Sequence, residues 1–342
     1  MPIGMMLCAA VYLFRNKAKP SAQYNALSVE LLVPVRNEPF AVLEKLKLRM
    51  QDFQRQKNLT CTVIDDGSYT PVQQTLGDSN LRIIRLDSGE TGSKKRALSK
   101  AIHSTNAEWI ITSDADTHNR PGWIDTLRLQ MKPETDFIAA PVFVSPENRL
   151  IAQFSQCESL CLWTIALASQ FLRAPLLCSG ANLAFRRQAF LDSGGYDEHL
   201  NMPSGDDVLL MHQLWKRNPR SITCCVDKDA ACFTTAPENW AAWFKQRRRW
   251  ISKTGHVQHP FKILLLALLA VWLYLPFILL GCALPLAALF LAIEMVWIVL
   301  LARFYAVAIP RFDWLLFRFT YPIALPFVFL VRPGRWKAQG KP

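Results

Sequence analysis

Two aspartates, Asp114 and Asp116, stand one residue apart directly after the apolar run 109–112. A short apolar run predicts a buried strand, and ligands of open α/β sheets bind at the carboxyl ends of the strands. Mg²⁺ or Mn²⁺ accepts a few carboxylates at such a position and takes its other ligands from phosphate oxygens and water. A solvated turn can carry the same two residues. The choice between a metal site and a solvated turn therefore depends on the other polar segments of the chain.

Polar residues also follow the first two strands that the pattern predicts. Asp65 and Asp66 end the second strand, where they form either an Asx-type turn or carboxylates that bind a base or ribose. Pro34, Arg36 and Glu38 surround the end of the first strand, where a nucleotide-contacting loop and a plain strand-to-helix connection both fit the sequence. Since parallel strands end at one edge of a sheet, these residues are expected near Asp114.

Two helix starts carry residues suited to phosphate or proton chemistry. Lys94 follows Gly92 and Ser93 at the start of a basic helix, and helix N-termini attract phosphate. The spacing is not that of a P-loop, and a solvated basic face is the alternative. Asp206 and Asp207 precede an apolar helix, where they either complement the helix dipole or supply a general base for an acceptor hydroxyl.

A third charged segment, with Gln246, Arg249 and Trp250, precedes the most apolar part of the chain. A basic cluster with a tryptophan is common at a membrane interface. Alternatively, the Gln and Arg side chains bind a pyrophosphate and the Trp ring faces a sugar.

Strand and helix patterns alternate along the first half of the chain, which predicts an α/β fold with a parallel sheet. We expect strands at residues 28–35, 59–64, 81–86 and 109–112, and helices at 38–54 and 94–103. The second half predicts strands at 138–144 and 180–185, one or two strands within 221–233, and helices at 150–174, 208–216 and 240–250.

The apolar residues are concentrated toward the C-terminus of the 342-residue chain, which is 51% hydrophobic. Residues 263–280 carry no charge, and 283–301 carry Glu294 alone. Either stretch is long enough to cross a bilayer. Residues 314–331 contain Arg318 and two prolines and predict a kinked span or an interfacial helix. Residues 1–14 predict a short or interfacial anchor and, without a preceding basic region, not a cleaved signal peptide.

The formal net charge of +12 favours an anionic membrane face and a phosphate ligand. Basic residues flank the segment between the apolar regions, so by the positive-inside tendency it is cytoplasmic. The basic residues beyond residue 331 would also lie on the cytoplasmic side, which favours two C-terminal spans. No aromatic-basic pattern supports nucleic acid.

The nine cysteines lack a C-x-x-C pair and are expected to be reduced, buried side chains rather than a zinc site. The chain thus divides into an anchor (1–19), a cytoplasmic domain (20–258) and a membrane region (259–342).

Together and in this order, these segments resemble the family 2 glycosyltransferases with a GT-A fold, in particular the membrane-bound branch of cellulose, chitin and hyaluronan synthases. The resemblance covers roughly residues 28–255, and its most specific element is Gln-x-x-Arg-Trp before an apolar segment. It implies a nucleotide diphosphate sugar as donor, expected to be a UDP-sugar, and Mg²⁺ or Mn²⁺. It also implies inversion at the anomeric carbon and a lipid, lipid-linked or polysaccharide acceptor at a multi-pass membrane location such as the bacterial inner membrane.

The resemblance also assigns roles to single residues. Asp207 would be the base beside Asp206, and Asp116 the direct metal ligand together with Asp114. The remaining roles go to the donor-side residues Pro34, Arg36, Glu38, Asp65, Asp66, Lys94 and Asp114, and to the acceptor- or diphosphate-binding residues Gln246, Arg249, Trp250, Gly180 and Asn182.

This chain departs from the family pattern at three positions, since Ser93 stands for Gly, Ser99 for Asn and Asp206 for Glu. With few apolar segments for a channel, transfer of a single sugar is as compatible with the sequence as polymer export. Two alternatives remain: a nucleotidyltransferase, which also uses paired acids and a metal, and a membrane protein that binds nucleotide sugars without turnover.

Overall fold

The computed structural model describes residues 3–16, 27–77, 81–87, 93–145, 147–200, 205–252, 283–308 and 313–330, and the helical positions 270, 274–275, 277–278 and 280–281. The described residues fall into two compact units. The first, here called the sheet unit, comprises Ala18–Pro141 and Cys178–Cys232. The second, the helical unit, comprises Met1–Lys17, Val142–Leu177 and Phe233–Pro333. This division groups part of the predicted cytoplasmic domain with the terminal helices.

The sheet unit is built on a seven-stranded sheet with the order β3-β2-β1-β4-β8-β6-β9. Strands β1 to β4 are parallel, β8 is antiparallel to both β4 and β6, and β6 is parallel to β9. The predicted α/β fold with a parallel-dominated sheet is therefore confirmed. The strands are β1 (Val29–Val35), β2 (Leu59–Asp65), β3 (Arg82–Arg85), β4 (Trp109–Ser113), β6 (Phe137–Ala139), β8 (Asn182–Arg186) and β9 (Ile222–Cys224).

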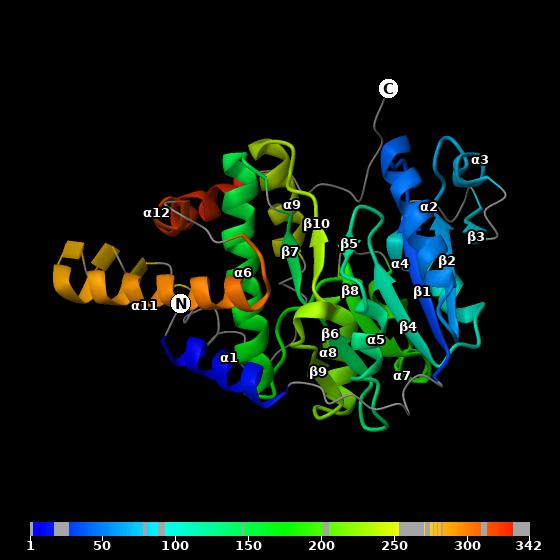
Figure 1. Cartoon of the computed structure of the whole chain (residues 1–342), viewed down its shortest axis with the longest axis horizontal. Coiled ribbons are helices and arrows are strands. Elements are labelled where there is room, and N and C mark those ends of the chain that lie inside the picture. The colour runs from blue at the N-terminus through cyan, green and yellow to red at the C-terminus, as the bar shows by residue number, and fades with distance from the viewer. Residues whose placement is uncertain are drawn as a thin grey trace. The chain divides into compact units, whose positions relative to one another are not determined.

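Helices α2 (Phe40–Gln54) and α4 (Lys94–His103) cover opposite faces of β1 and β2 (Figure 1). Alternate residues of a strand point to opposite faces, so Leu31 and Val33 join the core cluster that holds Leu46 and Met50 of α2. All seven residues of β1 are buried, because helices cover both faces. The sheet unit also contains α3 (Val72–Leu76), β5 (His118–Asn119), α5 (Trp123–Arg128), α7 (Arg187–Asp192), η2 (Asp197–His199), α8 (Val208–Arg217) and η3 (Lys228–Ala230).

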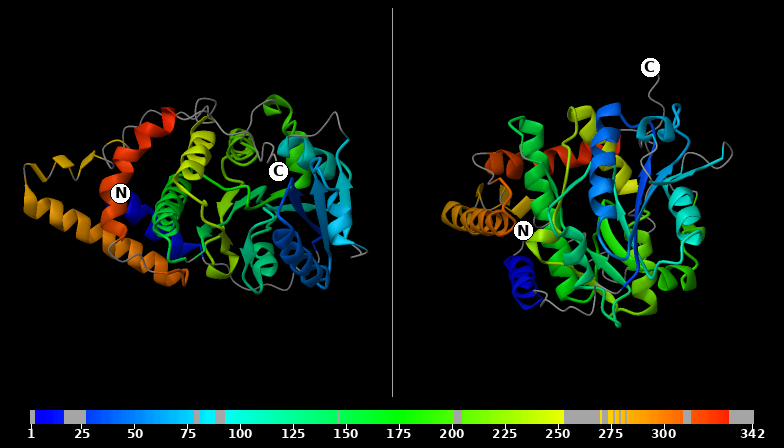
Figure 2. Two further views of the ribbon diagram at one scale, coloured as in Figure 1. Left: turned by 90° about the horizontal axis from the view of Figure 1, so that it is seen from above. Right: turned by 45° about the vertical axis from the view of Figure 1, so that its right-hand side comes forward.

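In the helical unit, α6 (Leu150–Phe171) packs against α1 (Ile3–Arg15), α11 (Leu284–Phe304) and α12 (Asp313–Phe327) (Figure 2). A buried ion pair joins α11 to α12, since Arg318 Nε lies 2.9 Å from Glu294 Oε2 and neither side chain is more than 1% exposed. The unit also holds β7 (Val142–Val144), α9 (Trp240–Ser252) and η5 (Val328–Leu330), and β10 (Cys232–Thr234) begins at the last residue of the sheet unit.

Two described helices, α6 and α11, are long and apolar enough to cross a membrane, which is weak evidence for a membrane location. They differ in their surroundings, because 78% of the most apolar window of α6 is buried within the protein and only 28% of that of α11. Thus α6 is a core helix, and the described residues do not support a multi-pass topology. The predicted span 263–280 lies mostly outside them.

Prolines explain two of the departures from the predicted bounds. The predicted helix 38–54 begins at Phe40, after Pro39 at its N-cap, because the residue before a proline disfavours helical geometry. The single strand predicted at 138–144 is divided into β6 and β7 by Ala140 and Pro141, and Pro141 lacks an N–H for a strand ladder.

Candidate active site

Two carboxylates from separate parts of the sheet unit meet at Lys94. Its Nζ atom lies 2.7 Å from Asp114 Oδ1 and 3.1 Å from Asp206 Oδ2. The lysine side chain is 13% exposed, that of Asp206 is 14% exposed, and that of Asp114 is 42% exposed. The structure therefore brings together three of the predicted site residues, and Lys94 pairs with both carboxylates in a group that remains open to solvent through Asp114.

The local fold explains how each of these residues reaches the site. Asp114 follows the last residue of β4, and Lys94 is the first residue of α4, whose N-cap Ser93 accepts a hydrogen bond from the Arg96 amide. Asp206 follows Gly205, whose φ of +98° is rarely adopted by residues with a side chain. Strand end, helix start and glycine turn thus converge on one point.

Asp207 lies beside this group as the N-cap of α8. Its carboxylate accepts hydrogen bonds from the Val208 amide at 2.6 Å and from the Gly180 amide at 3.3 Å. Both contacts use backbone donors, so they fix the carboxylate without a neutralising side chain in these two bonds. Asp207 is therefore held next to Gly180.

Gly180 leaves no room for a side chain at this position. A Cβ atom there would lie 2.7 Å from Asp206 Oδ2 and 3.3 Å from Lys94 Nζ. The carbonyl of Gly180 also accepts a hydrogen bond of 2.9 Å from Thr112 on β4. The glycine thus allows the chain after Ser179 to pass directly over the Lys94–Asp206 ion pair.

The site perturbs two titratable groups. Burial lowers the pKa of Lys94, but the charges of Asp114 and Asp206 outweigh burial and raise this pKa above its ordinary value, so that the lysine is protonated. Burial raises the pKa of Tyr196 well above its ordinary value, and Asp206 and Asp207 raise it further. Tyr196 was missed by sequence reasoning, because an isolated tyrosine carries no recognisable pattern.

Asp114 and Asp116 fit a hard divalent cation that takes most of its ligands from elsewhere. Both residues are partly exposed at the end of β4, and carboxylate oxygens are the ligands that Mg²⁺ and Mn²⁺ prefer. Within the described residues, no three or more His, Cys, Asp or Glu side chains are grouped so as to hold a metal ion. The pair therefore suits a cation that a diphosphate would help to hold, and Cys224, Cys225 and Cys232 are buried side chains.

The predicted donor-side residues are placed less favourably. Asp65 is 1% exposed, and its carboxylate accepts hydrogen bonds from the Ser68 and Val72 amides and from Arg85 Nη1 at 2.8 Å. These contacts give Asp65 a structural role, and its contact with the nucleotide stays a prediction. Asp66 is also buried and pairs with Arg36 at 3.3 Å.

Two other residues predicted on the donor side lie in a strand and in a connection. Pro34 is buried within β1, opposite Ile64 of β2, rather than in a loop. Glu38 is partly exposed in the connection to α2. Asn37, in the same connection, has a φ of +52°, and its side-chain Oδ1 accepts a hydrogen bond from the Tyr69 amide.

Asn182 is fully buried, and its amide group binds only protein atoms among the contacts described. Nδ2 donates to the carbonyls of Pro141 and Ala230, both at 2.8 Å, and Oδ1 accepts from Trp123 Nε1 at 3.0 Å. A side chain in this environment joins three segments of the sheet unit. These contacts give Asn182 a structural role, and its contact with an acceptor or diphosphate stays a prediction.

The Gln-x-x-Arg-Trp segment lies on α9 in the helical unit, with Arg247 as its buried residue. Arg247 Nε lies 2.9 Å from Glu158 Oε2 of α6, and its guanidinium stacks on the rings of Trp243 and Trp250 at 4.6 and 4.7 Å. Sequence reasoning chose Gln246, Arg249 and Trp250 and missed Arg247. The sequence did hold a sign that a basic partner is needed, because Glu158 is the one charged residue of α6.

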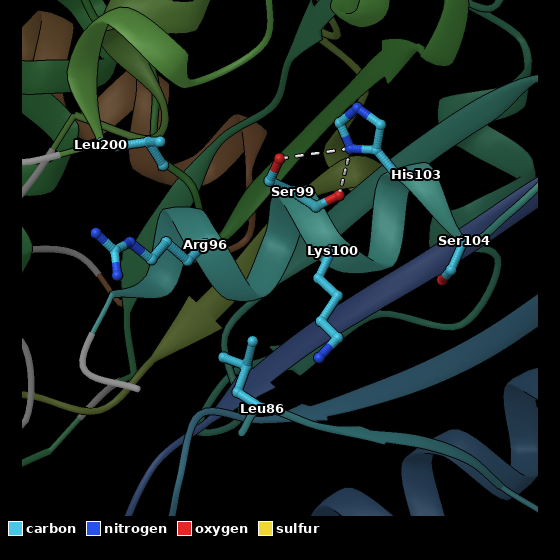
Figure 3. Close-up of a pocket in the computed structure, with 7 residues that line it drawn as sticks. All are labelled: Leu86, Arg96, Ser99, Lys100, His103, Ser104 and Leu200. Carbon is cyan, nitrogen blue, oxygen red and sulfur yellow. Dashed lines mark hydrogen bonds between the residues drawn. The ribbon is translucent and has the colours of Figure 1, made fainter. Parts of the chain in front are cut away.

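An open pocket lies on the outer side of α4, away from Lys94. Figure 3 shows Arg96, Ser99, Lys100 and His103 of this helix beside Leu86 and Leu200. Lys100 Nζ also pairs with Asp87 at 3.2 Å. The pocket contains none of the predicted site residues, so the carboxylate group around Lys94 remains the candidate active site.

The sequence model of "Glycosyl transferase family group 2" matches residues 109–310, which is more than half of the chain. The chain belongs to this family, as the sequence predicted. A probable glycosyltransferase of Bacillus subtilis (strain 168), YdaM, is 22% identical over 248 residues. That alignment covers 68% of this chain, which spans 56% of the length of the relative.

A solved structure of similar fold is the mannosyltransferase PcManGT from Pyrobaculum calidifontis, determined with GDP-Man and Mn²⁺. The two chains are 19% identical, the match covers 98% of this chain and 96% of the other, and the TM-score is 0.59. At this identity the likeness establishes the fold, which is the predicted GT-A glycosyltransferase fold.

Proposed function

We propose that this protein transfers a sugar from a nucleotide diphosphate sugar, with UDP-sugars as the first choice, to an acceptor hydroxyl at a membrane. The observation that carries the proposal is the group in which Lys94 joins Asp114 to Asp206 while Asp207 is held beside Gly180. It unites an acid pair at a strand end with a carboxylate that can receive a proton. Family membership supports the same reaction class.

The proposed reaction is a single displacement that inverts the anomeric carbon. The acceptor oxygen bonds to this carbon while the bond from the carbon to the diphosphate oxygen breaks. Asp207 takes the proton of the acceptor hydroxyl, and the nucleoside diphosphate leaves with the bonding electrons. Lys94 is proposed to stabilise that leaving group with its charge, a role that the family resemblance also gives to Gln246 and Arg249.

Mg²⁺ or Mn²⁺ near Asp114 and Asp116 would supply positive charge that neutralises the leaving diphosphate. Asp116 is proposed as the direct ligand, since Asp114 Oδ1 already accepts a hydrogen bond from Lys94. The Mn²⁺ in the structure of the mannosyltransferase PcManGT, which shares this fold, supports the choice of metal.

The membrane setting is proposed from α11. One stripe of this helix is buried, comprising Ala287, Phe290, Glu294, Ile298 and Leu301, while apolar residues such as Leu286 and Val296 are more than half exposed. Its most apolar window has a mean hydropathy of 2.5. An exposed surface of this composition suits lipid, so we propose a lipid or lipid-linked acceptor, with a polysaccharide as the runner-up. The likeness to the cellulose, chitin and hyaluronan synthase branch stays a prediction, as does the cytoplasmic placement of the catalytic residues.

The test is nucleotide release by the detergent-solubilised full chain with a membrane lipid extract. The donors are UDP-, GDP- and TDP-sugars, each assayed with Mn²⁺, Mg²⁺ or EDTA. Asp207→Asn is the informative variant, because asparagine is as good an N-cap as aspartate and the start of α8 is preserved. Asp227→Asn is the matched control, since Asp227 also caps a helical turn through its carboxylate.

We expect release that needs metal, starts from one donor, and falls by about 10²- to 10⁴-fold in Asp207→Asn while donor affinity is kept. Asp227→Asn should behave as wild type. Release of pyrophosphate in place of a nucleoside diphosphate would indicate the nucleotidyltransferase alternative. Equal behaviour of both variants, with donor bound but never consumed, would indicate a binding protein.

A further inference from the structure

Arg49 of α2 reaches the backbone that carries the two metal-site aspartates. Its Nη2 donates to the carbonyl of Asp114 at 3.0 Å, and its Nη1 donates to the carbonyl of Thr117 and to Thr117 Oγ1, the latter at 2.7 Å. The same nitrogen lies 3.4 Å from Asn119 Oδ1. One guanidinium therefore spans the segment from Asp114 to Asn119, with Asp116 between its contacts.

A hydroxyl network closes the turn beneath this guanidinium. Thr117, which is 3% exposed, donates from Oγ1 to the carbonyl of Asp114 at 2.8 Å, and its Oγ1 lies 2.8 Å from Ser113 Oγ. Arg49 and Thr117 therefore act on the same carbonyl from two directions. Hydrogen bonds from a charged donor are stronger than neutral ones, so Arg49 contributes most to holding the turn.

The charge of Arg49 also suits this position. Burial lowers the pKa of the guanidinium, while the carboxylates of Asp116 and Asp114 act in the opposite direction. An arginine remains protonated in such surroundings. It thus offsets the repulsion between two carboxylates that must lie close together, whatever the ligand.

We propose that Arg49 is a positioning residue that fixes the Asp114–Asp116 turn in the conformation that binds the divalent cation. It acts through the backbone and does not itself contact the metal. This inference rests on the proposed function, because it assumes that these carboxylates hold Mg²⁺ or Mn²⁺. Sequence reasoning missed Arg49, because it lies 65 residues before Asp114 in an ordinary amphipathic helix.

The test uses Mn²⁺ as the probe, with the full chain in detergent. Free Mn²⁺ is measured by electron paramagnetic resonance in the presence of UDP and, separately, of GDP. The variants are Arg49→Met, which removes the guanidinium, and Arg49→Lys, which keeps the charge but loses the forked donors. Arg128→Met is the matched control, since Arg128 is a buried arginine of the same unit that donates to the carbonyl of Lys57 at 2.8 Å.

We expect Arg49→Met to weaken apparent Mn²⁺ affinity by about 10- to 100-fold, the range for residues that orient metal ligands, and Arg49→Lys to restore part of it. Arg128→Met should keep wild-type affinity even where it lowers stability. A second readout needs no ligand: amide hydrogen exchange across residues 113–119 should accelerate in Arg49→Met and not in the control.

Thr117→Val covers the case in which Arg49→Met fails to fold, because it removes the hydroxyl network and leaves the arginine in place. It should weaken Mn²⁺ binding severalfold. Wild-type Mn²⁺ affinity and unchanged exchange in the folded variants would overturn the inference and leave the proposed function standing. Absence of Mn²⁺ binding in the wild-type protein with either nucleotide would overturn both.

Discussion

The two units of this molecule place charged side chains in opposite ways. In the sheet unit, Lys94 pairs with both Asp114 and Asp206, and Asp114 is 42% exposed. In the helical unit, Arg247 with Glu158 and Arg318 with Glu294 form one-to-one pairs in which no side chain is more than 5% exposed. One lysine thus faces two carboxylates at the open site, and the buried pairs are balanced.

The difference separates charges that serve a ligand from charges that serve the fold. A carboxylate group with excess negative charge and access to solvent can receive a cation or a proton, and the strand ends that carry it are rigid. A buried ion pair without solvent has no capacity for a ligand, but it constrains which helices can pack together. Removing one charged partner is therefore expected to lower stability in the helical unit and turnover in the sheet unit.

The largest expected effect is on stability in the helical unit. Arg247→Met leaves Glu158 buried beside apolar and aromatic side chains, and Tyr321, at 3.0 Å, is the donor that remains among the described contacts. Breaking a buried pair in this way costs about 3–5 kcal/mol of unfolding free energy. Thermal unfolding of the detergent-solubilised chain should show a clearly lower midpoint.

The double variant Glu158→Leu with Arg247→Met tests the cause, because it removes the stranded charge and should recover most of the loss. Arg249→Met is the control for removing an arginine from α9 and should change the midpoint little. An Arg247→Met protein as stable as wild type would mean that the pair does not hold α6 to α9.

The second effect is on turnover in the sheet unit. Lys94→Met removes the cation between Asp114 and Asp206, so that two carboxylates face each other and the leaving diphosphate loses a donor. We expect kcat to fall by about 10²- to 10³-fold, with the fold retained because Asp114 is open to water. Arg96→Met removes a basic side chain of the same helix that is exposed outside the site, and it should retain wild-type turnover. Equal losses in both variants would assign the effect to the charge of α4 as a whole.

The sheet-unit strands could be predicted because each element is local. The helix 94–103 has its predicted bounds, and β1, β2 and β4 differ from prediction by one residue at an end. Periodicity suffices where helices cover both faces of a parallel sheet. The sequence also singled out Lys94, Asp114, Asp206 and Asp207, since each stands at or beside the end of an element that is visible in the sequence.

Burial and pairing were harder to predict. Asp65 looks like a ligand residue in the sequence, and only the fold shows that two backbone amides and Arg85 surround it. Glu294 and Arg318 were treated as interruptions of apolar segments. Because a lone buried charge is costly, each should have been expected to need a partner, but which partner depends on tertiary packing.

The smallest expected effect on turnover comes from adding one methyl group, and it compares a glycine of the sheet unit with one of the helical unit. A Cβ at residue 180 would meet Asp206 Oδ2 at 2.7 Å, whereas one at Gly4 on α1 would meet nothing within 4 Å. Gly180→Ala should therefore displace the flexible end of Asp206 and with it Lys94, and lower turnover by about 10- to 100-fold, as small misplacements in active sites do. Gly4→Ala should leave turnover unchanged.

Stability should respond differently from turnover in this pair. Replacing glycine by alanine restricts the unfolded chain, which stabilises a protein by about 0.4–1 kcal/mol where the backbone tolerates it. Gly4→Ala should show that gain in thermal unfolding, while in Gly180→Ala the contact with Asp206 offsets it. If Gly180→Ala keeps wild-type turnover, the site tolerates movement of the Lys94–Asp206 pair, and the sheet unit is then less dependent on exact charge placement than the helical unit.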